Sequence, residues 1–231
     1  MDSETLDPNH IRDAGDFEDW LHDLLHSFTS GHGTNVPCGD CRACCSSGYF
    51  IPVSPDETKT ISAISADALF HSPRHPTGDV LLIGLKKSGR CSLLKNKQCS
   101  IYRARPQACR DYDCRLFAAA GIDPEIPEID KTIRKWRFSY RSDAAVETHA
   151  AIRTAAKFLR THSADFPSGK APQKPDEVAI TAIKAHGVFK NSRHANKSKR
   201  SLISEYIEAC KYYEENGRIW EEQGDAGPIR T

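Results

Sequence analysis

The chain has 231 residues, and 32 Lys and Arg against 31 Asp and Glu leave a formal net charge of +1. A charge this close to zero gives no electrostatic case for binding nucleic acid or an anionic membrane, and no apolar run approaches the roughly 20 residues that span a bilayer. The acidic start of the chain lacks a signal-peptide pattern. We therefore expect a cytosolic protein, in which thiols stay reduced.

The first predicted elements are a loose segment and one helix. Residues 1–15 are acidic and rich in turn formers, and residues 31–35 are expected to be a flexible lead into the first cysteine group. Between them, apolar residues recur at steps of three and four and predict an amphipathic helix: Phe17, Trp20, Leu21, Leu24, Leu25 and Phe28. His22 and His26 on this helix have a spacing that can chelate a metal, although exposed surface histidines are the favoured interpretation.

Short elements are predicted next. Residues 49–53 fit an edge strand, because Pro52 cannot donate to a ladder. Residues 54–57 fit a capping box, from Ser54 to Glu57, that starts a helix running to about Leu69. Residues 71–78 fit a loop that includes His71 and His75, and residues 80–85 form the best strand pattern in the chain.

The C-terminal half is predicted to be mainly helical. Aromatic residues alternate from Trp136 to Tyr140 and indicate a strand. Helices are predicted at about 143–161, 176–185 and 199–216, with a linker at 166–175. Cys210 falls on the apolar stripe of the last helix and is expected to be a core residue. The basic stretch from Val178 to Ser204 is expected to be solvated, and nucleic acid is not an expected partner.

The most informative stretch is Cys38-Gly-Asp-Cys41-Arg-Ala-Cys44-Cys45. Together with four further cysteines it suggests a metal centre, because reduced thiols grouped at two-residue spacings can converge on zinc, iron or an iron–sulfur cluster. The eight candidate ligands are Cys38, Cys41, Cys44, Cys45, Cys91, Cys99, Cys109 and Cys114. Adjacent side chains diverge on an extended backbone, so Cys44 and Cys45 reach one centre only through a tight turn, or each serves a different one. Two four-thiolate sites, one polynuclear centre, or one site with reactive thiols all fit.

Charged residues surround the cysteines. Six arginines can offset thiolate charge: Arg42, Arg90, Arg103, Arg105, Arg110 and Arg115. Of these, Arg105 and Arg110 are the first candidates to hydrogen-bond the thiolates. The nearby carboxylates are Asp40, Asp111 and Asp113, for which an ordinary pairing with arginine is favoured over a catalytic role.

Three segments carry a family resemblance. They are the stretch from Cys38 to Cys45, then Gly89-Arg-Cys-Ser-Leu-Leu94, then Cys99-Ser-Ile-Tyr-x-x-Arg-Pro-x-x-Cys-Arg110. Over about residues 36–117 the chain resembles the YkgJ-type cysteine-cluster family, also known as the CxxCxxCC domain, which is described as zinc- or iron-chelating. The resemblance implies that the eight clustered cysteines are the ligand set, with Cys114 in the most variable position.

These observations predict an α+β fold, mostly helical, with a small irregular β element around a cysteine-ligated metal centre. The expected divisions are an N-terminal segment (1–35), a metal-binding domain (36–166) and a linker with C-terminal helices (167–231). The expected function is a structural or metal-handling centre that holds zinc or iron. The alternatives are an iron- or iron–sulfur-dependent enzyme that modifies a protein or peptide, and a metal-folded module whose C-terminal helices dock a protein partner.

Overall fold

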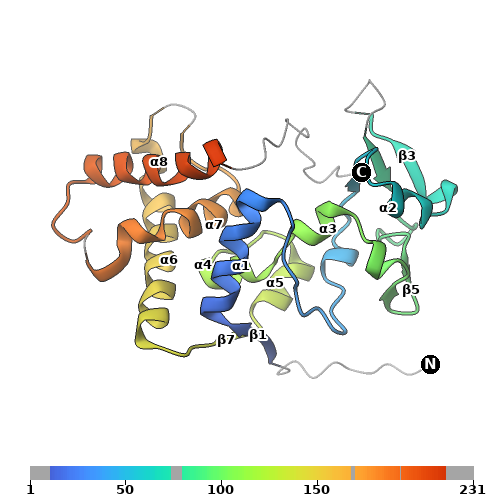
Figure 1. Cartoon of the computed structure of the whole chain (residues 1–231), viewed down its shortest axis with the longest axis horizontal. Coiled ribbons are helices and arrows are strands. Elements are labelled where there is room, and N and C mark those ends of the chain that lie inside the picture. The colour runs from blue at the N-terminus through green and yellow to red at the C-terminus, as the bar shows by residue number, and fades with distance from the viewer. Residues whose placement is uncertain (1–10, 74–79, 168–169, 193, 217–231) are drawn as a thin grey trace.

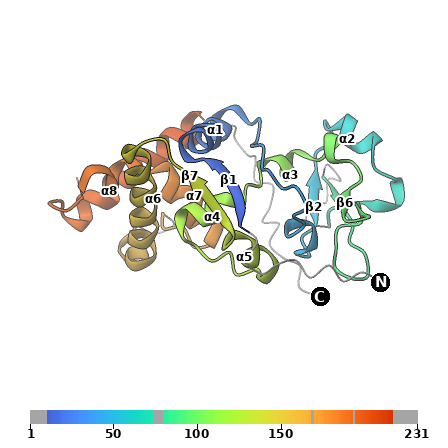
Figure 2. The ribbon, with the colours of Figure 1, turned by 90° about the horizontal axis from the view of Figure 1, so that it is seen from below.

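The computed structural model describes residues 11–73, 80–167, 170–192 and 194–216, and its elements form two lobes (Figure 1). The helical lobe contains β1, β7, α1 and α4–α8. The strand lobe contains α2 and the short strands β2–β6, and Figures 1 and 2 place α3 (Gln107–Asp111) between the two. The predicted α+β, mostly helical fold is confirmed.

The helical lobe is built around the long helix α6 (Asp143–His162). It packs against α4 (Arg115–Ala120), α7 (Pro175–Lys184) and the 3-10 helix His186–Ser192. One continuous apolar cluster runs from Ala14 to Cys210 and includes α8 (Lys199–Asn216). The predicted helices at 143–161, 176–185 and 199–216 are confirmed, and so is the core position of Cys210. Val146 of α6 is 49% exposed and lies outside this core.

A parallel strand pair closes the same lobe. β7 (Trp136–Ser139) confirms the predicted strand, but its partner β1 (Arg12–Asp16) lies in the segment expected to be loose. The sequence of β1 has little intrinsic β propensity, so its conformation comes from pairing with β7 across the fold. Residues 1–10 lie outside the described part of the chain. Asp16 then caps the predicted helix α1 (Phe17–Ser30) by accepting from the backbone amides of Glu18 and Asp19.

The strand lobe contains a three-stranded antiparallel sheet in the order β2–β4–β3. β2 (Ile51–Val53) is an edge strand, as Pro52 predicts, and β4 (Leu81–Ile83) lies in the centre. The helix expected to reach Leu69 is wrong in length, because α2 covers only Thr58–Ser62. Leu69–His71 forms β3 instead, since pairing with β4 outweighs the helical tendency. His71 therefore lies in a strand, while His75 falls outside the described residues.

The second cysteine group forms a hairpin that sequence reasoning did not anticipate. β5 (Leu94–Lys95) pairs with β6 (Gln98–Cys99) through Asn96 and Lys97, whose φ values are 46° and 61°. Two consecutive positive φ values are typical of the tight turns that suit a two-residue hairpin. The turn places Cys99 next to the segment that carries Cys91.

The strand lobe has a much smaller core than the helical lobe. Its apolar cluster consists of the buried residues Val53, Ile64, Ile83, Cys91 and Leu93, and Leu82 and Leu94 are also buried in this lobe. Glu57 links this lobe to α3: it accepts from the Ser54 amide at 2.9 Å and from the Gln107 amide at 2.6 Å. The prediction that Ser54 caps the helix is wrong, because α2 begins at Thr58 with Glu57 as its N-cap. No helix within the described ranges is both long and apolar enough to cross a membrane.

His149 of α6 is a buried histidine that must stay neutral in the folded protein. Its ring stacks on Phe17 at a centroid distance of 4.7 Å, Nε2 donates to the Ala119 carbonyl at 3.0 Å, and Nδ1 accepts from the Tyr140 hydroxyl at 2.6 Å. Burial, with the nearby charge of Arg153, lowers the pKa of His149 from 6.5 to about 4.

We expect this histidine to make the fold acid-sensitive. Between pH 6.5 and pH 4 the unfolded chain takes up a proton that the folded chain does not, so stability is lost as the pH falls through this window. From pH 7.5 to pH 5, wild-type protein should lose about 2 kcal/mol more unfolding free energy than His149→Gln. Urea denaturation of both proteins at the two pH values measures this difference. Equal losses would contradict the prediction, because acid effects on the cysteines are common to both proteins.

Candidate metal centre

Three chain segments carry the eight candidate cysteines. Cys38 and Cys114 pack against the apolar cluster of the helical lobe, while Cys45 and Cys91 pack in that of the strand lobe. In the first segment, the Cys41 amide donates to the Cys38 carbonyl at 2.7 Å, and Cys44–Ser46 forms a 3-10 turn. The tight turn that would allow both Cys44 and Cys45 to face one centre is therefore present. The Cys91 amide donates to the Cys45 carbonyl at 2.9 Å and joins the second segment to the first.

The third segment is held by a close backbone approach. Cys109 lies in α3, and Cys114 is the N-cap of α4. The chain leading to Cys38 passes against α3 at Gly33, where a Cβ would lie 2.8 Å from the Arg110 carbonyl oxygen. Gly33 also has a φ of +70°, and the next amide, Thr34, donates to that same oxygen at 3.0 Å. The stretch 31–35 is thus part of the packing, and the expectation of a flexible lead was wrong.

The thiols form a connected electrostatic group. Burial is the main reason why the pKa of Cys38 is raised. The charges of Cys41 and Cys45 raise this pKa further, and the charge of Arg105 lowers it. Burial and the charges of Cys45, Cys91 and Cys99 raise the pKa of Cys109. Burial likewise raises the pKa of Cys114 to about 12, with contributions from Cys41 and Cys38. Each of the eight thiols is close enough to another for their charges to interact, whereas Cys210 lies apart near Lys184 and Tyr206.

Cys44 and Cys45 behave as a pair. A hydrogen bond between the two side chains raises the pKa of Cys44 and lowers the pKa of Cys45 to about 7. Arg42 adds to the lowering at Cys45. Cys45 is thus the cysteine with a lowered pKa in this group. Cys44 is the exposed member of the cluster, the other seven being half-buried or buried.

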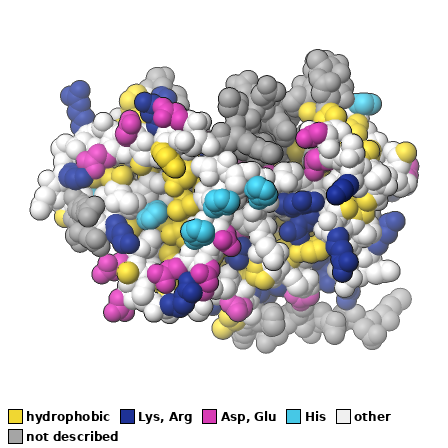
Figure 3. Space-filling view, in the orientation of Figure 1, with side chains coloured by type: hydrophobic (Ala, Val, Ile, Leu, Met, Phe, Trp, Pro, Cys, Tyr) yellow, Lys and Arg dark blue, Asp and Glu magenta, His cyan; other side chains and the backbone are white. Residues whose placement is uncertain are grey.

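Positive charge accompanies the cluster. From Val80 to Arg110 the sequence contains eight Lys or Arg and no Asp or Glu, and Lys and Arg side chains gather over the strand lobe in Figure 3. The charge of Arg105 lowers the pKa of Cys38, Cys99 and Cys109, which supports charge compensation, whereas its hydrogen bond to a thiolate stays a prediction. Arg110 instead donates from Nε to the Arg105 carbonyl at 3.1 Å, and this hydrogen bond holds the backbone at Arg105. The guanidinium of Arg105 also lies 4.4 Å from the centroid of the Tyr102 ring.

Hydrogen-bond donors from the helical lobe also reach the sulfurs. Trp136 Nε1 donates to Cys114 Sγ at 3.3 Å, and Thr132 Oγ1 of α5 (Pro127–Ile133) lies 3.8 Å from Cys41 Sγ. Burial, then the charges of Cys114 and Cys44, raises the pKa of Tyr112, which places this phenol beside the same thiols. Sequence reasoning missed all three residues, since no local spacing connects them with the cysteine motif.

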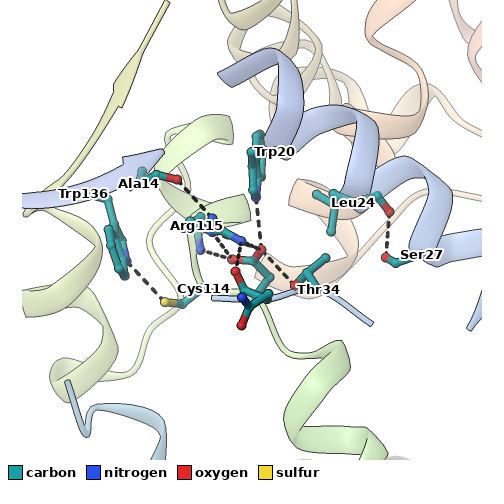
Figure 4. A network of polar contacts seen from close by, with 10 residues as sticks. Ala14, Trp20, Leu24, Ser27, Thr34, Cys114, Arg115 and Trp136 are labelled. Atoms are coloured by element: carbon teal, nitrogen blue, oxygen red, sulfur yellow. Dashed lines mark hydrogen bonds and ion pairs between the residues drawn. The ribbon is translucent and has the colours of Figure 1, made fainter. Parts of the chain in front are cut away.

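A buried ion pair adjoins the cluster (Figure 4). Asp113 is 0% exposed and accepts from Trp20 Nε1 at 3.1 Å, Thr34 Oγ1 at 3.0 Å and the Arg115 guanidinium at 2.7 Å. Arg115 also donates to the Ala14 carbonyl at 3.0 Å. The carboxylate next to Cys114 thus links β1, α1 and the chain that precedes Cys38. This pairing supports the structural interpretation of Asp113 over the catalytic one.

The other two candidate carboxylates pair with neighbouring side chains. Asp40 pairs with Arg12 at 2.7 Å, and Asp111 accepts from the Gln107 side chain at 2.7 Å. The rings of His22 and His26 stack on the surface of α1 with centroids 6.5 Å apart. Across the part of the chain that the structure describes, no three His, Cys, Asp or Glu side chains already have a geometry that could hold a metal ion, and all nine cysteines are free thiols.

The thiols are clustered, arginines offset their charge, and an indole and hydroxyl groups lie beside them. This arrangement defines a cysteine-cluster domain. Residues 37–137, somewhat less than half of the chain, match the model of the CxxCxxCC family, described as a "putative zinc- or iron-chelating domain". The match confirms the resemblance seen in the sequence and extends it to β7. It supports metal binding as the general function. No curated protein and no solved structure matches the chain.

Proposed function

We propose that the eight clustered cysteines bind zinc or iron, and that the bound centre has a structural role, fastening the strand lobe to the helical lobe. The proposed binding unit is residues 36–166, flanked by the segment up to residue 35 and the C-terminal helices from residue 167. Apolar side chains from all three parts pack in the same cluster. A reducing, cytosolic setting belongs to the proposal, because closely spaced thiols remain available as ligands where disulfides do not form.

The observation that carries this proposal is the proximity of eight thiols from three separate segments. Most of them are raised in pKa by burial and by one another, so they resist ionisation without a cation. A bound metal supplies the positive charge that stabilises thiolates, and its binding is coupled to proton release and to folding. Within the described residues no three such side chains are arranged to hold a metal ion, which fits a site that is completed on binding.

The small core of the strand lobe supports a structural role. The buried apolar cluster of this lobe is small for a sheet, a hairpin and a short helix. Cys91 belongs to that core, while Cys38 and Cys114 pack against the helical cluster. Metal–thiolate bonds between them would cross the junction and supply the cohesion that the apolar contacts do not.

The first experiment is to measure metal and acid-labile sulfide, with a visible spectrum, on protein purified without oxygen. We expect bound zinc or iron in wild-type protein and in Cys210→Ser, and its loss in Cys109→Ser, because Cys109 lies among Cys45, Cys91 and Cys99. Cys210 is the matched control, a buried thiol 3.9 Å from the Thr181 carbonyl and away from the cluster. Colourless protein with zinc supports the structural centre.

Other outcomes point elsewhere. Iron with sulfide would identify an iron–sulfur cluster and make the enzyme alternative the leading one. Metal-free wild-type protein, or equal metal in Cys109→Ser and Cys210→Ser, would contradict binding by the cysteine cluster. Metal-loaded protein that captures a partner through α8 would favour the metal-folded interaction module.

A further inference from the structure

Tyr112, at the end of α3, has a buried hydroxyl without a hydrogen-bond partner among the described residues. Its backbone is fixed, since the Tyr112 amide donates to the Ala108 carbonyl at 3.2 Å. Burying a hydroxyl without a partner is costly, and such groups are rare in folded proteins. The phenol therefore calls for an acceptor that forms in the functional state of the protein.

Its neighbours identify that acceptor. Tyr112, Cys114 and Tyr49 pack against the same apolar cluster, and Cys114 and then Cys44 are the thiols whose charges act most strongly on the phenol. A neutral thiol is a weak acceptor, whereas a thiolate sulfur is a strong one, and a tyrosine at neutral pH has a proton to donate. Trp136 Nε1 already donates to Cys114 Sγ at 3.3 Å, so this sulfur accepts hydrogen bonds from outside the metal site.

We propose that Tyr112 is a positioning residue of the metal centre, whose hydroxyl donates to the metal-bound thiolate of Cys114 alongside Trp136 Nε1. The inference rests on the proposed function, because the acceptor becomes a thiolate when metal binds. Hydrogen bonds of this kind orient ligands, and their loss typically weakens metal affinity 10- to 100-fold. The Tyr112 hydroxyl thus has a hydrogen-bond acceptor in the metal-bound protein and lacks one in the metal-free protein.

The test is Tyr112→Phe, which removes only the hydroxyl, compared with Tyr206→Phe. Tyr206 of α8 is also buried, and its hydroxyl lies beside Thr181 and Cys210, away from the cluster. In metal-loaded protein, Tyr112→Phe should lower the Tm and about 10-fold less chelator should strip the metal. In stripped protein it should raise the Tm or leave it unchanged. Tyr206→Phe should change the Tm by the same amount in both states.

A second readout reports on the sulfur itself. In protein reconstituted with Co²⁺, Tyr112→Phe should move the thiolate-to-metal absorption band to longer wavelength, because a thiolate without the hydrogen bond gives up electron density more easily. An unchanged band and chelator midpoint, in wild-type protein that holds metal through Cys109, would overturn this inference and leave the proposed function intact. Wild-type protein that holds no metal would overturn both.

Discussion

Asp113→Ala is expected to destabilise the protein by about 3–5 kcal/mol, the range seen when one partner of a buried ion pair is removed. The carboxylate is 0% exposed, and the side chain of its partner Arg115 is 8% exposed. Without Asp113, the guanidinium is left buried with only carbonyl acceptors, and Trp20 and Thr34 lose their acceptor. Chemical denaturation followed by tryptophan fluorescence measures the change.

The matched control is Arg134→Ala, which breaks ion pairs with Asp130 and Asp123 on the surface. Exposed pairs contribute little to stability, so its denaturation midpoint should stay close to wild type. The double variant Asp113→Leu with Arg115→Met should recover part of the loss, because neither charge is then buried alone. If Asp113→Ala were as mild as the control, the pair would not hold the two cysteine segments to the helical lobe.

Removing the metal is expected to loosen the strand lobe while the helical lobe stays folded. The small apolar cluster of the strand lobe cannot hold β2–β6 without a further constraint, whereas α6 lies in a large apolar cluster. Structural zinc contributes about 10–16 kcal/mol to folding in small zinc-binding peptides. Amide hydrogen exchange should therefore become at least about tenfold faster in β4 after chelation, which corresponds to a loss of about 1.4 kcal/mol of local stability.

Exchange in α6 provides the internal comparison within the same sample. It should change much less than exchange in β4, and adding back zinc should restore the protection of β4. Uniform deprotection of both elements would mean that the metal supports the whole fold. Unchanged exchange in β4 would mean that metal binding does not stabilise the strand lobe.

The sequence predicted those elements whose signals are local. The apolar stripes of α1, α6, α7 and α8 show at helical spacing, and Pro52 predicts an edge strand by its missing amide. The shortened α2 was missed because pairing of β3 with β4 decides its end. β1 was missed because its partner lies more than a hundred residues away in the chain.

The same contrast holds at the candidate metal centre. The cysteine spacing pointed to eight thiols without help from the fold, and Arg105 was identified because it lies inside the motif. Trp136, Thr132 and Tyr112 belong to different elements and meet the sulfurs only in three dimensions. Asp113 could be seen in the sequence, but its burial against Trp20 could not be read from its neighbours.

The pairing of β1 with β7 has a consequence for how the protein is made. Arg12 pairs with Trp136, so the ribosome must synthesise the entire cysteine segment before β1 can find its partner. All eight clustered thiols emerge while the core that will shield them is incomplete, because α6, α7 and α8 come later in the chain. Domains commonly begin to fold during synthesis, N-terminal parts first. We therefore expect the nascent chain to offer its thiols to metal, or to an oxidant, before the helices close over them.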